Sequence, residues 1–199
     1  MPGSPRHEAS QIGNMLPATE VEPWTGTVVL GLGCLTSDGF APRQLKNVPS
    51  HDPRYGGAWL SDGDLLISRS NTFELVGLIG RYRDVGTPCV CPDLMMKLAP
   101  TALVRAEFLE LVLRNVDVRE QIKRMSQGTS GSMVKINSSA LMKLMVKIPD
   151  LQTQDRILSI YAAERAVREA EEQRIAKLRK LKEALMDDLL TGRVRVPAS

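Results

Sequence analysis

The chain has 199 residues, of which 43% are hydrophobic and 25% charged, and its formal net charge is +3 at pH 7. This length and composition suit one globular domain with an appendage. No apolar run approaches the ~20 residues of a membrane-spanning helix, and the N-terminus lacks the charged-then-apolar order of a secretion signal. We therefore expect a cytoplasmic protein, and so small a net charge does not by itself indicate nucleic-acid binding.

The first half of the chain predicts short strands separated by loops. Residues 1–22 are polar and aperiodic, which indicates a flexible arm. Segments rich in Val, Leu and Ile that are bounded by Gly, Pro or Asp predict strands, and these are residues 25–32, 64–71, 75–81 and 87–91. Residues 36–57 carry Gly, Pro, Asn and Ser, which predicts a long loop. Together these elements predict a mixed sheet.

The next part of the chain predicts helices and two further strands. Pro100 suits the first turn of a helix, and Asn137 suits a helix N-cap. The expected elements are a helix over 100–115, a basic helical turn or two over 118–125, a polar loop over 128–132, a strand over 133–136, a helix over 138–144 and a strand over 145–148.

Residues 152–190 contain neither Gly nor Pro and are rich in strong helix formers, so they predict one long helix. At 1.5 Å per residue it would extend about 55 to 60 Å, more than the width of a domain of this size. Apolar residues recur every three or four positions and predict a stripe that pairs with a second helix. The expected pairing residues are Ile160, Val167, Ile175, Leu178, Leu181 and Leu185.

Charged residues interrupt this stripe at Glu171 and Arg174, so a short irregular helix pair is expected in place of a regular zipper. The alternative is a terminal helix that folds back on its own domain. The basic run from Arg174 to Lys182 is interpreted as a solvated face, with contact to the DNA backbone or to an acidic partner as the alternative.

No catalytic constellation is evident. The Asn/Asp-Pro-Pro-aromatic signature of adenine methyltransferases is absent, and Gly31 and Gly33 lack a third glycine at phosphate-binding spacing. Three cysteines, Cys34, Cys89 and Cys91, form no even framework, which favours reduced thiols. With only two histidines in the chain, we expect neither a metal site nor a nucleophilic triad. The sequence predicts no cofactor and no catalysis by this chain.

Side chains suited to nucleic acid gather instead at loops and strand ends. Arg, Asn and Gln can hydrogen-bond to base edges, and Lys, Ser, Thr and loop amides can hold phosphates. The candidate DNA-binding residues are Arg69, Asn71, Arg81, Arg83, Lys123, Arg124, Gln127, Thr129, Ser130 and Lys135. The ordinary explanation of each one alone is a solvated surface residue. Arg69 has the further alternative of an ion pair with Asp62 or Asp64.

Four segments follow one another in a distinctive order and spacing. They read DLLISRSN after a Gly-Asp turn, GTSGSMVKIN, KIPDLQTQDRI and LLTGRVRV. Together, over residues 24–196, they resemble the DNA-specificity (S) subunit of type I restriction-modification systems. In that family the first segment lies in a target recognition domain, and the later segments lead into a long spacer helix.

The chain departs from the family pattern in two ways. Family members usually carry two recognition domains and two long helices, whereas this chain has one of each, so it resembles a half-length S subunit. At the helix start, Asp150 and Leu151 stand where a second Pro is common, and Thr153 stands where Glu is common.

The resemblance implies a DNA-reading subunit of a larger assembly. A separate methyltransferase subunit would dock on the helix and supply the S-adenosylmethionine chemistry, and an endonuclease/translocase subunit would join it for cleavage of double-stranded DNA. Two copies paired through antiparallel long helices would make a two-headed homodimer that reads an interrupted palindrome. The rival hypotheses are a coiled-coil adaptor whose head binds protein and a small hydrolase with an unrecognised site.

The expected architecture is α/β (α+β). It comprises a flexible arm over residues 1–22, a mixed-sheet target recognition domain over 23–150, a long spacer and dimerisation helix over 151–190, and a C-terminal tail over 191–199.

Overall fold

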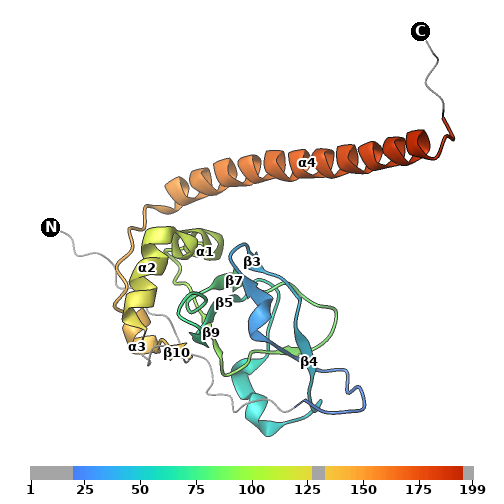
Figure 1. Cartoon of the computed structure of the whole chain (residues 1–199). Coiled ribbons are helices and arrows are strands. Elements are labelled where there is room, and N and C mark those ends of the chain that lie inside the picture. Colours follow the sequence, from blue (N-terminus) through green and yellow to red (C-terminus); the bar gives the residue numbers. More distant parts are fainter. Residues whose placement is uncertain (1–19, 127–132, 195–199) are drawn as a thin grey trace. The chain divides into compact units, whose positions relative to one another are not determined.

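A computed structural model of the chain describes residues 20–126 and 133–194; these residues form short strands, two 3-10 helices, three short α-helices and one long C-terminal helix (Figure 1). The expected α+β class is therefore confirmed. The chain divides into two compact units between Gln154 and Asp155. We call the described residues up to Gln154 the head.

The first sheet of the head is centred on β1 (Val28–Leu30), whose three residues are all buried. β4 (Leu45–Asn47) pairs with β1 antiparallel, and β8 (Cys89–Val90) pairs with it parallel. A parallel pair needs a long connection, here the whole segment between β1 and β8. The sheet therefore joins parts of the chain that are far apart in sequence, and its side chains form a first hydrophobic core.

The second sheet is centred on β5 (Leu65–Ser68), which lies antiparallel between β7 (Ile79–Arg81) and β9 (Met95–Leu98). All four residues of β5 are buried, as the sequence predicts. The second residue of β5 belongs to the first core, whereas the first and third belong to a second core. This division arises because successive side chains of a strand point to opposite faces. β5 thus joins the two cores.

Two short ladders complete the strands. β2 (Leu35–Thr36) pairs with β3 (Gly39–Phe40), and β6 (Ser70–Asn71) pairs with β10 (Val134–Lys135). β3 crosses β7 at Gly80, where an added Cβ atom would overlap the backbone of β3. Glycine is therefore required at this close approach of two backbones.

Five helices accompany the strands in the described head. Two are 3-10 helices, η1 (Leu32–Cys34) and η2 (Pro53–Ala58), and three are α1 (Ala106–Arg114), α2 (Val116–Met125) and α3 (Ser138–Leu141). α1 and α2 lie next to one another (Figure 1). Apolar residues of both pack into the second core.

Asparagine side chains cap α2 and α3. Asn115 accepts a hydrogen bond from the amide of Asp117 at 2.9 Å, and Asn137 accepts one from the amide of Ala140 at 2.7 Å. These bonds satisfy amides that the first turn of a helix leaves unpaired. The predicted cap at Asn137 is confirmed.

Several predicted boundaries are wrong, because short strands depend on partners that the local sequence does not reveal. The segment 36–57, predicted as a loop, contains β3, β4 and η2. The segment 145–148, predicted as a strand, has no regular structure. The sequence does not predict β9, since Met-Met-Lys-Leu contains no β-branched residue.

Two predicted elements begin later than expected. The strand predicted from residue 75 begins at Ile79, because residues 73–77 form a turn. The helix predicted from Pro100 begins at Ala106. In both cases the type of element is correct and the boundary is wrong.

The end of the N-terminal segment is bound to the first sheet. The amide of Val21 donates to Asn47 O at 3.1 Å, and the Asn47 side chain donates to Val21 O at 2.6 Å and to Pro23 O at 2.9 Å. The last part of the predicted arm is therefore held against β4. Residues 1–19 lie outside the described residues.

α4 (Leu151–Leu190) is one helix of 40 residues and confirms the long helix predicted from the sequence. Gln154 is its buried residue. Ion pairs four residues apart join Arg165 to Glu169 at 2.6 Å and Arg168 to Glu164 at 2.8 Å. Such pairs support a helix from within its own turns.

Candidate functional site

Arg69 occupies the break between β5 and β6, and its backbone joins three segments of the head. Its amide donates to Leu94 O at 2.8 Å, and its carbonyl accepts from the amide of Ile136 at 2.9 Å. No described residue forms a hydrogen bond or ion pair with the Arg69 side chain. The sheet therefore fixes the position of the Arg69 backbone.

The alternative that Arg69 pairs with Asp62 or Asp64 is wrong. Asp64 binds Lys97 of β9 at 2.6 Å, and Asp62 binds Arg83 at 3.5 Å. The Arg83 and Asp62 side chains are both more than half exposed, and exposed pairs of this kind contribute about 0 to 1 kcal/mol. Arg83 can therefore exchange its carboxylate for a phosphate at little cost.

Asn71 is a buried residue, only 7% exposed. Its side-chain oxygen accepts from the amide of Thr72 at 2.8 Å, and its amide nitrogen donates to the Ser68 hydroxyl at 3.4 Å. These bonds shape the exit from β6. The structure therefore places Asn71 as a support for the loop, with its amide turned to protein groups.

Arg81 joins the second sheet to α1. Its guanidinium pairs with Glu107 and lies 3.4 Å from a carboxylate oxygen of Glu110. Both acids belong to α1, whereas Arg81 ends β7. An arginine held by two carboxylates is poorly suited to bind phosphate, so the structure favours a packing role for Arg81.

Lys123 of α2 lies close to Phe73 and Glu74, two residues that follow β6 in the chain. Its ammonium is 2.9 Å from Glu74, 3.1 Å from Glu120 and 5.7 Å from the ring centre of Phe73. The hydrogen bond to Glu74 is the main cause that raises the pKa of Lys123. A DNA phosphate would have to compete with two carboxylates for this ammonium.

Arg124 and Lys135 are both exposed, and no described residue pairs with either side chain. Arg124 lies near the end of α2, and Lys135 lies on β10 opposite Ser70. These two residues flank the segment 127–132. Through this pairing Lys135 lies next to β6, the strand that begins directly after Arg69.

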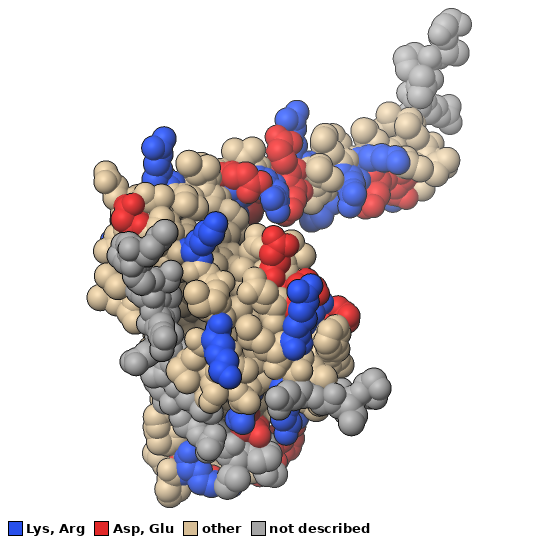
Figure 2. Space-filling model, turned by 90° about the vertical axis from the view of Figure 1, so that its left-hand side faces the viewer, with Lys and Arg blue, Asp and Glu red and all other residues tan. Residues whose placement is uncertain are grey.

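We call Arg69, Arg124 and Lys135 the open cation group. The predicted residues Gln127, Thr129 and Ser130 lie outside the described residues, in the segment that joins α2 to β10. On the face that carries α2, α3 and β10, Lys and Arg side chains stand apart on a largely uncharged surface (Figure 2). This face of the head offers a polyanion several cations and few competing acids.

Two further exposed cations, Lys143 and Lys147, follow α3 and have no partner among the described residues. Sequence reasoning missed them: it assigned Lys143 to the helix expected over 138–144 and Lys147 to the strand expected over 145–148. The signal available in the sequence was two lysines four residues apart in an otherwise apolar stretch.

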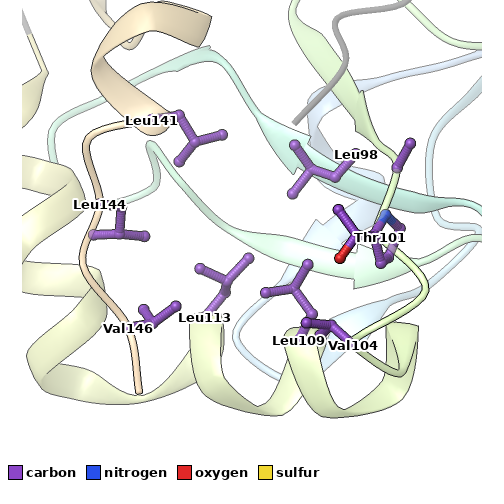
Figure 3. A pocket seen from close by; sticks show the side chains of 10 residues that line it. Leu98, Thr101, Val104, Leu109, Leu113, Leu141, Leu144 and Val146 are labelled. Carbon is purple, nitrogen blue, oxygen red and sulfur yellow. The ribbon is translucent and has the colours of Figure 1, made fainter. Parts of the chain in front are cut away.

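An apolar hollow of about 60 Å³ lies between β9, α1, α3 and residues 144–146. The labelled side chains of Leu98, Leu109, Leu113 and Leu141 point toward one another across it (Figure 3). None of its lining residues is charged. Such a hollow offers packing space and lacks the convergent polar groups of a catalytic or nucleotide site.

The cysteines belong to the first core. Cys34, Cys89 and Cys91 are free and buried. Burial raises the pKa of Cys89 to about 11 and that of Cys91 to about 12, so both remain neutral thiols near pH 7.

Within residues 20–126 and 133–194, no three His, Cys, Asp or Glu side chains are grouped as metal ligands. Over the same part of the chain, no helix is both long and apolar enough to span a membrane.

The predicted pairing residues of α4 are all exposed in the single chain. They are Ile160, Val167, Ile175, Leu178, Leu181 and Leu185. Exposed apolar side chains that recur along one helix indicate a surface that binds another helix.

The chain is 28% identical over 141 residues to the type I restriction enzyme HindI specificity subunit of Haemophilus influenzae, over 69% of this chain and 29% of that protein. No protein-family model matches the chain.

Two solved structures share its fold. The HsdS subunit from Thermoanaerobacter tengcongensis is 20% identical, with a TM-score of 0.58 over 98% of this chain and 51% of that one. A chain from a study of the assembly and conformational transition of the type I R-M system is 17% identical, with a TM-score of 0.55 over 94% of this chain and 47% of that one. The chain thus spans under a third of the curated relative and about half of each solved chain.

The fold and these similarities define a class of protein. The chain resembles the specificity subunits of type I restriction-modification systems, as its motifs indicate, and it has the fold of about half of such a subunit.

Proposed function

We propose that the head of this chain reads one half-site of a bipartite DNA target in a type I restriction-modification assembly. The observation that carries this proposal is the open cation group on a domain with the specificity-subunit fold. Three cations have no partner among the described residues: Arg124 and Lys135 lie on either side of residues 127–132 in the sequence, and Arg69 directly precedes the strand that pairs with that of Lys135. Groups of this kind neutralise DNA phosphates and release counterions.

The members of the open cation group have different roles in the proposal. Arg69 is the base-reading residue, because its backbone is fixed by the sheet and a guanidinium can bind guanine O6 and N7 together. Arg124 and Lys135 hold phosphates. Arg83 adds a further phosphate contact. Gln127, Thr129 and Ser130 remain proposed contacts, because they lie in the segment between Arg124 and Lys135.

Asn71, Arg81 and Lys123 support the interface in this proposal and do not touch DNA. Each is already bound to protein groups: Asn71 to its own loop, Arg81 to α1 and Lys123 to Glu74. Their replacement would disturb the head without selecting a base.

We further propose that α4 pairs antiparallel with α4 of a second copy. Ile160, Glu164, Val167, Glu171, Arg174, Leu178, Leu181 and Leu185 follow one another at alternating spacings of four and three residues. In a parallel pair, equivalent residues face each other, so Glu171 would meet Glu171 of the second copy and Arg174 would meet Arg174. In an antiparallel pair centred between them, Glu171 faces Arg174.

The same centre matches the apolar positions. Val167 and Leu178 are equally far in sequence from the midpoint between Glu171 and Arg174, and so are Ile160 and Leu185. Ala170 and Ile175 are equidistant as well. This antiparallel register thus joins three apolar pairs and one acid–base pair, although it also sets Glu164 opposite Leu181. A parallel pair would instead bring like charges together at Glu171 and at Arg174, so the antiparallel orientation is favoured.

A two-fold pair of identical heads would read identical half-sites on opposite strands. The proposed target is therefore an interrupted palindrome with a constant unread spacer. In this proposal a methyltransferase subunit binds the paired helices and supplies S-adenosylmethionine, an endonuclease/translocase subunit completes the assembly, and the chain itself is non-catalytic.

The test is to map methylated sites in cells that express the methyltransferase subunit with and without this chain. Sites that appear only with the chain define its target. Arg69→Ala should then relax the sequence at one base position and cost about 1 to 3 kcal/mol of binding free energy. Arg43→Ala is the control, since Arg43 also has no described partner but is exposed and lies on the connection between β3 and β4. Equal losses on target and random DNA for Arg69→Ala would remove Arg69 from the reading role.

A second candidate function is an adaptor whose head binds protein. The observation that favours it is the exposure of Phe73, Met142 and Met145, since large exposed apolar side chains often mark protein contacts. If no new methylated sites appear while the chain is incorporated into the assembly, this second function is preferred.

A further inference from the structure

Gln154 is fully buried, at 0% exposure, although it lies in the first turn of a helix whose other residues are partly or fully exposed. A buried amide costs free energy unless its polar atoms are hydrogen-bonded. The side chain of Gln154 meets this condition with backbone groups only, and all of these lie within the head.

Three hydrogen bonds hold the amide of Gln154. Its oxygen accepts from the amide of Arg105 at 2.9 Å, and its nitrogen donates to Leu103 O at 2.9 Å and to Pro149 O at 2.8 Å. A glutamine amide has two N–H donors, and both are used here. One side chain thus joins three segments: the entry to α1, the end of the chain that follows α3, and the first turn of α4.

The segment 103–105, which hydrogen-bonds to Gln154, packs against the interior of the head. Val104, between the two residues that bond to Gln154, is buried and lines the apolar hollow with Leu109 and Leu113 (Figure 3). The side chain of Val104 thus attaches the backbone of residues 103–105 to the apolar interior of the head, and Gln154 forms two of its hydrogen bonds with this attached backbone.

The start of α4 is fixed in register as well. Asp150 accepts from the amide of Thr153 at 2.9 Å and from the Thr153 hydroxyl at 2.9 Å. Because α-helical residues are spaced about 100° apart around the axis, a change of one residue in the helix start would turn the amide of Gln154 away from all three partners. The cap and the buried amide therefore define a single position for the first turn.

We propose that Gln154 is a positioning residue: its buried amide holds the first turn of α4 in one position on the head, and this position sets the distance between the two half-sites. This inference rests on the proposed function. A straight helix of 40 residues extends about 60 Å, so a tilt of about 10° at its first turn moves its far end by roughly 10 Å. That displacement corresponds to about three base pairs at about 3.4 Å each. A constant spacer thus requires the tilt to be held within a few degrees, which directional hydrogen bonds achieve better than apolar contact.

Gln154→Glu is the sharpest variant, because the side chain keeps its size and loses both donors. A carboxylate oxygen would then face the carbonyl oxygens of Leu103 and Pro149. Gln154→Asn is the second variant, which keeps the amide but is too short to reach all three partners. Gln152→Glu is the matched control, since Gln152 lies in the same turn and is exposed.

The first measurement is independent of DNA. Spin labels are attached at Asp38→Cys in the head and Ala176→Cys on α4, two exposed positions, while the three native cysteines are buried. Labelled protein is diluted with unlabelled protein so that distances within one chain dominate. We expect one narrow distance distribution for the parent and for Gln152→Glu, and a distribution at least twice as wide for Gln154→Glu and Gln154→Asn. Equal widths for the parent and for both Gln154 variants would overturn the proposal.

The second measurement uses duplexes in which the methylated half-sites of the parent chain are separated by the native spacer or by one to three base pairs more or fewer. Gln154→Glu should lose at least tenfold of the preference for the native spacer, with the half-site sequence unchanged. An equal loss of binding at every spacer would show a general structural role and refute the positioning role. Failure of the parent to bind any duplex would count against the proposed function, and the label distances would still decide the role of Gln154.

Discussion

The head buries its apolar side chains, whereas the long helix leaves many of its own exposed. The head packs them into two internal cores that meet at β5, whereas α4 leaves Ile160 62% exposed and Val167 66% exposed. The head can therefore fold with its own contacts. Helices gain most of their stability from packing an apolar face, so the exposed residues of α4 support the proposal that it pairs with a second helix.

Ion pairs show the same contrast. In the head, Arg81 reaches Glu110 at 3.4 Å and Lys97 reaches Asp64 at 2.6 Å, so charges join different elements. On α4, charges pair within a turn, as Arg168 does with Glu164 at 2.8 Å. The ion pairs of the head thus connect different elements of the tertiary fold, whereas the ion pairs of α4 stabilise the helix itself and connect it to no other element.

The largest expected effect comes from removing the apolar stripe. Leu178→Lys with Leu181→Lys should abolish dimerisation, because one dimer buries four such leucines worth about 6 kcal/mol or more in total, and the ammonium at position 178 would face Val167 without a partner. Light scattering should show the monomer mass, and the thermal unfolding of the head should be unchanged. Lys177→Ala in the same turn is the control, and an unchanged mass for the double variant would mean that the stripe packs elsewhere.

The complementary change is made in the head. Ile67→Ala removes a side chain that is 0% exposed in the second core and should lower the free energy of unfolding of the head by about 2 to 5 kcal/mol. The dimer mass should persist wherever the head remains folded. Ser139→Ala, at an exposed position, serves as control. A loss of dimerisation at a temperature where the head stays folded would contradict the division of roles between the two regions.

A smaller effect tests the orientation of the helices. Glu171→Arg would face Arg174 of the second copy in the antiparallel register, and we expect dimerisation about tenfold weaker, or about 1.4 kcal/mol. The double variant with Arg174→Glu restores opposite charges and should recover the parent affinity. Sedimentation equilibrium measures both. If the double variant is no tighter than Glu171→Arg alone, the antiparallel register is incorrect.

The smallest effect concerns the junction at low pH. The hydrogen bond from the Thr153 amide is the main cause that holds the pKa of Asp150 below its ordinary value of 3.8. The stabilising cap is therefore complete above that ordinary value and is lost as the pH falls through the lowered pKa. A carbon NMR titration of the Asp150 carboxyl should show its midpoint below 3.8. In Asp150→Asn the helix start should be insensitive to pH, because asparagine caps without titrating; a midpoint of Asp150 at or above the ordinary value would exclude the cap.

The candidate site could be predicted only in part. The sequence places Arg69 at the end of a buried strand, and the structure shows that strand and the break after it. Sequence reasoning could not separate Arg69 from Arg81, since both follow apolar strands. Glu107 and Glu110, which pair with Arg81, lie on α1, more than twenty residues away. No local sequence pattern indicates this pairing.

The sequence by itself determined the elements whose hydrogen bonds are local. α4 runs from Leu151 to Leu190, within one residue of the predicted start and at the predicted end, because each helical bond joins residues four apart and no Gly or Pro interrupts them. The buried strand β5 and the cap at Asn137 follow from short-range patterns in the same way.

Only the tertiary structure decided which polar side chains are already bound. The amide of Gln154 finds its partners at Leu103 and Arg105, 51 and 49 residues away in sequence, and β9 finds its partner in β5 across the second core. The sequence lists Gln152 and Gln154 as two similar polar residues in one helical turn. The packing of the head buries one and exposes the other, because only one side of that turn faces backbone groups that need hydrogen bonds.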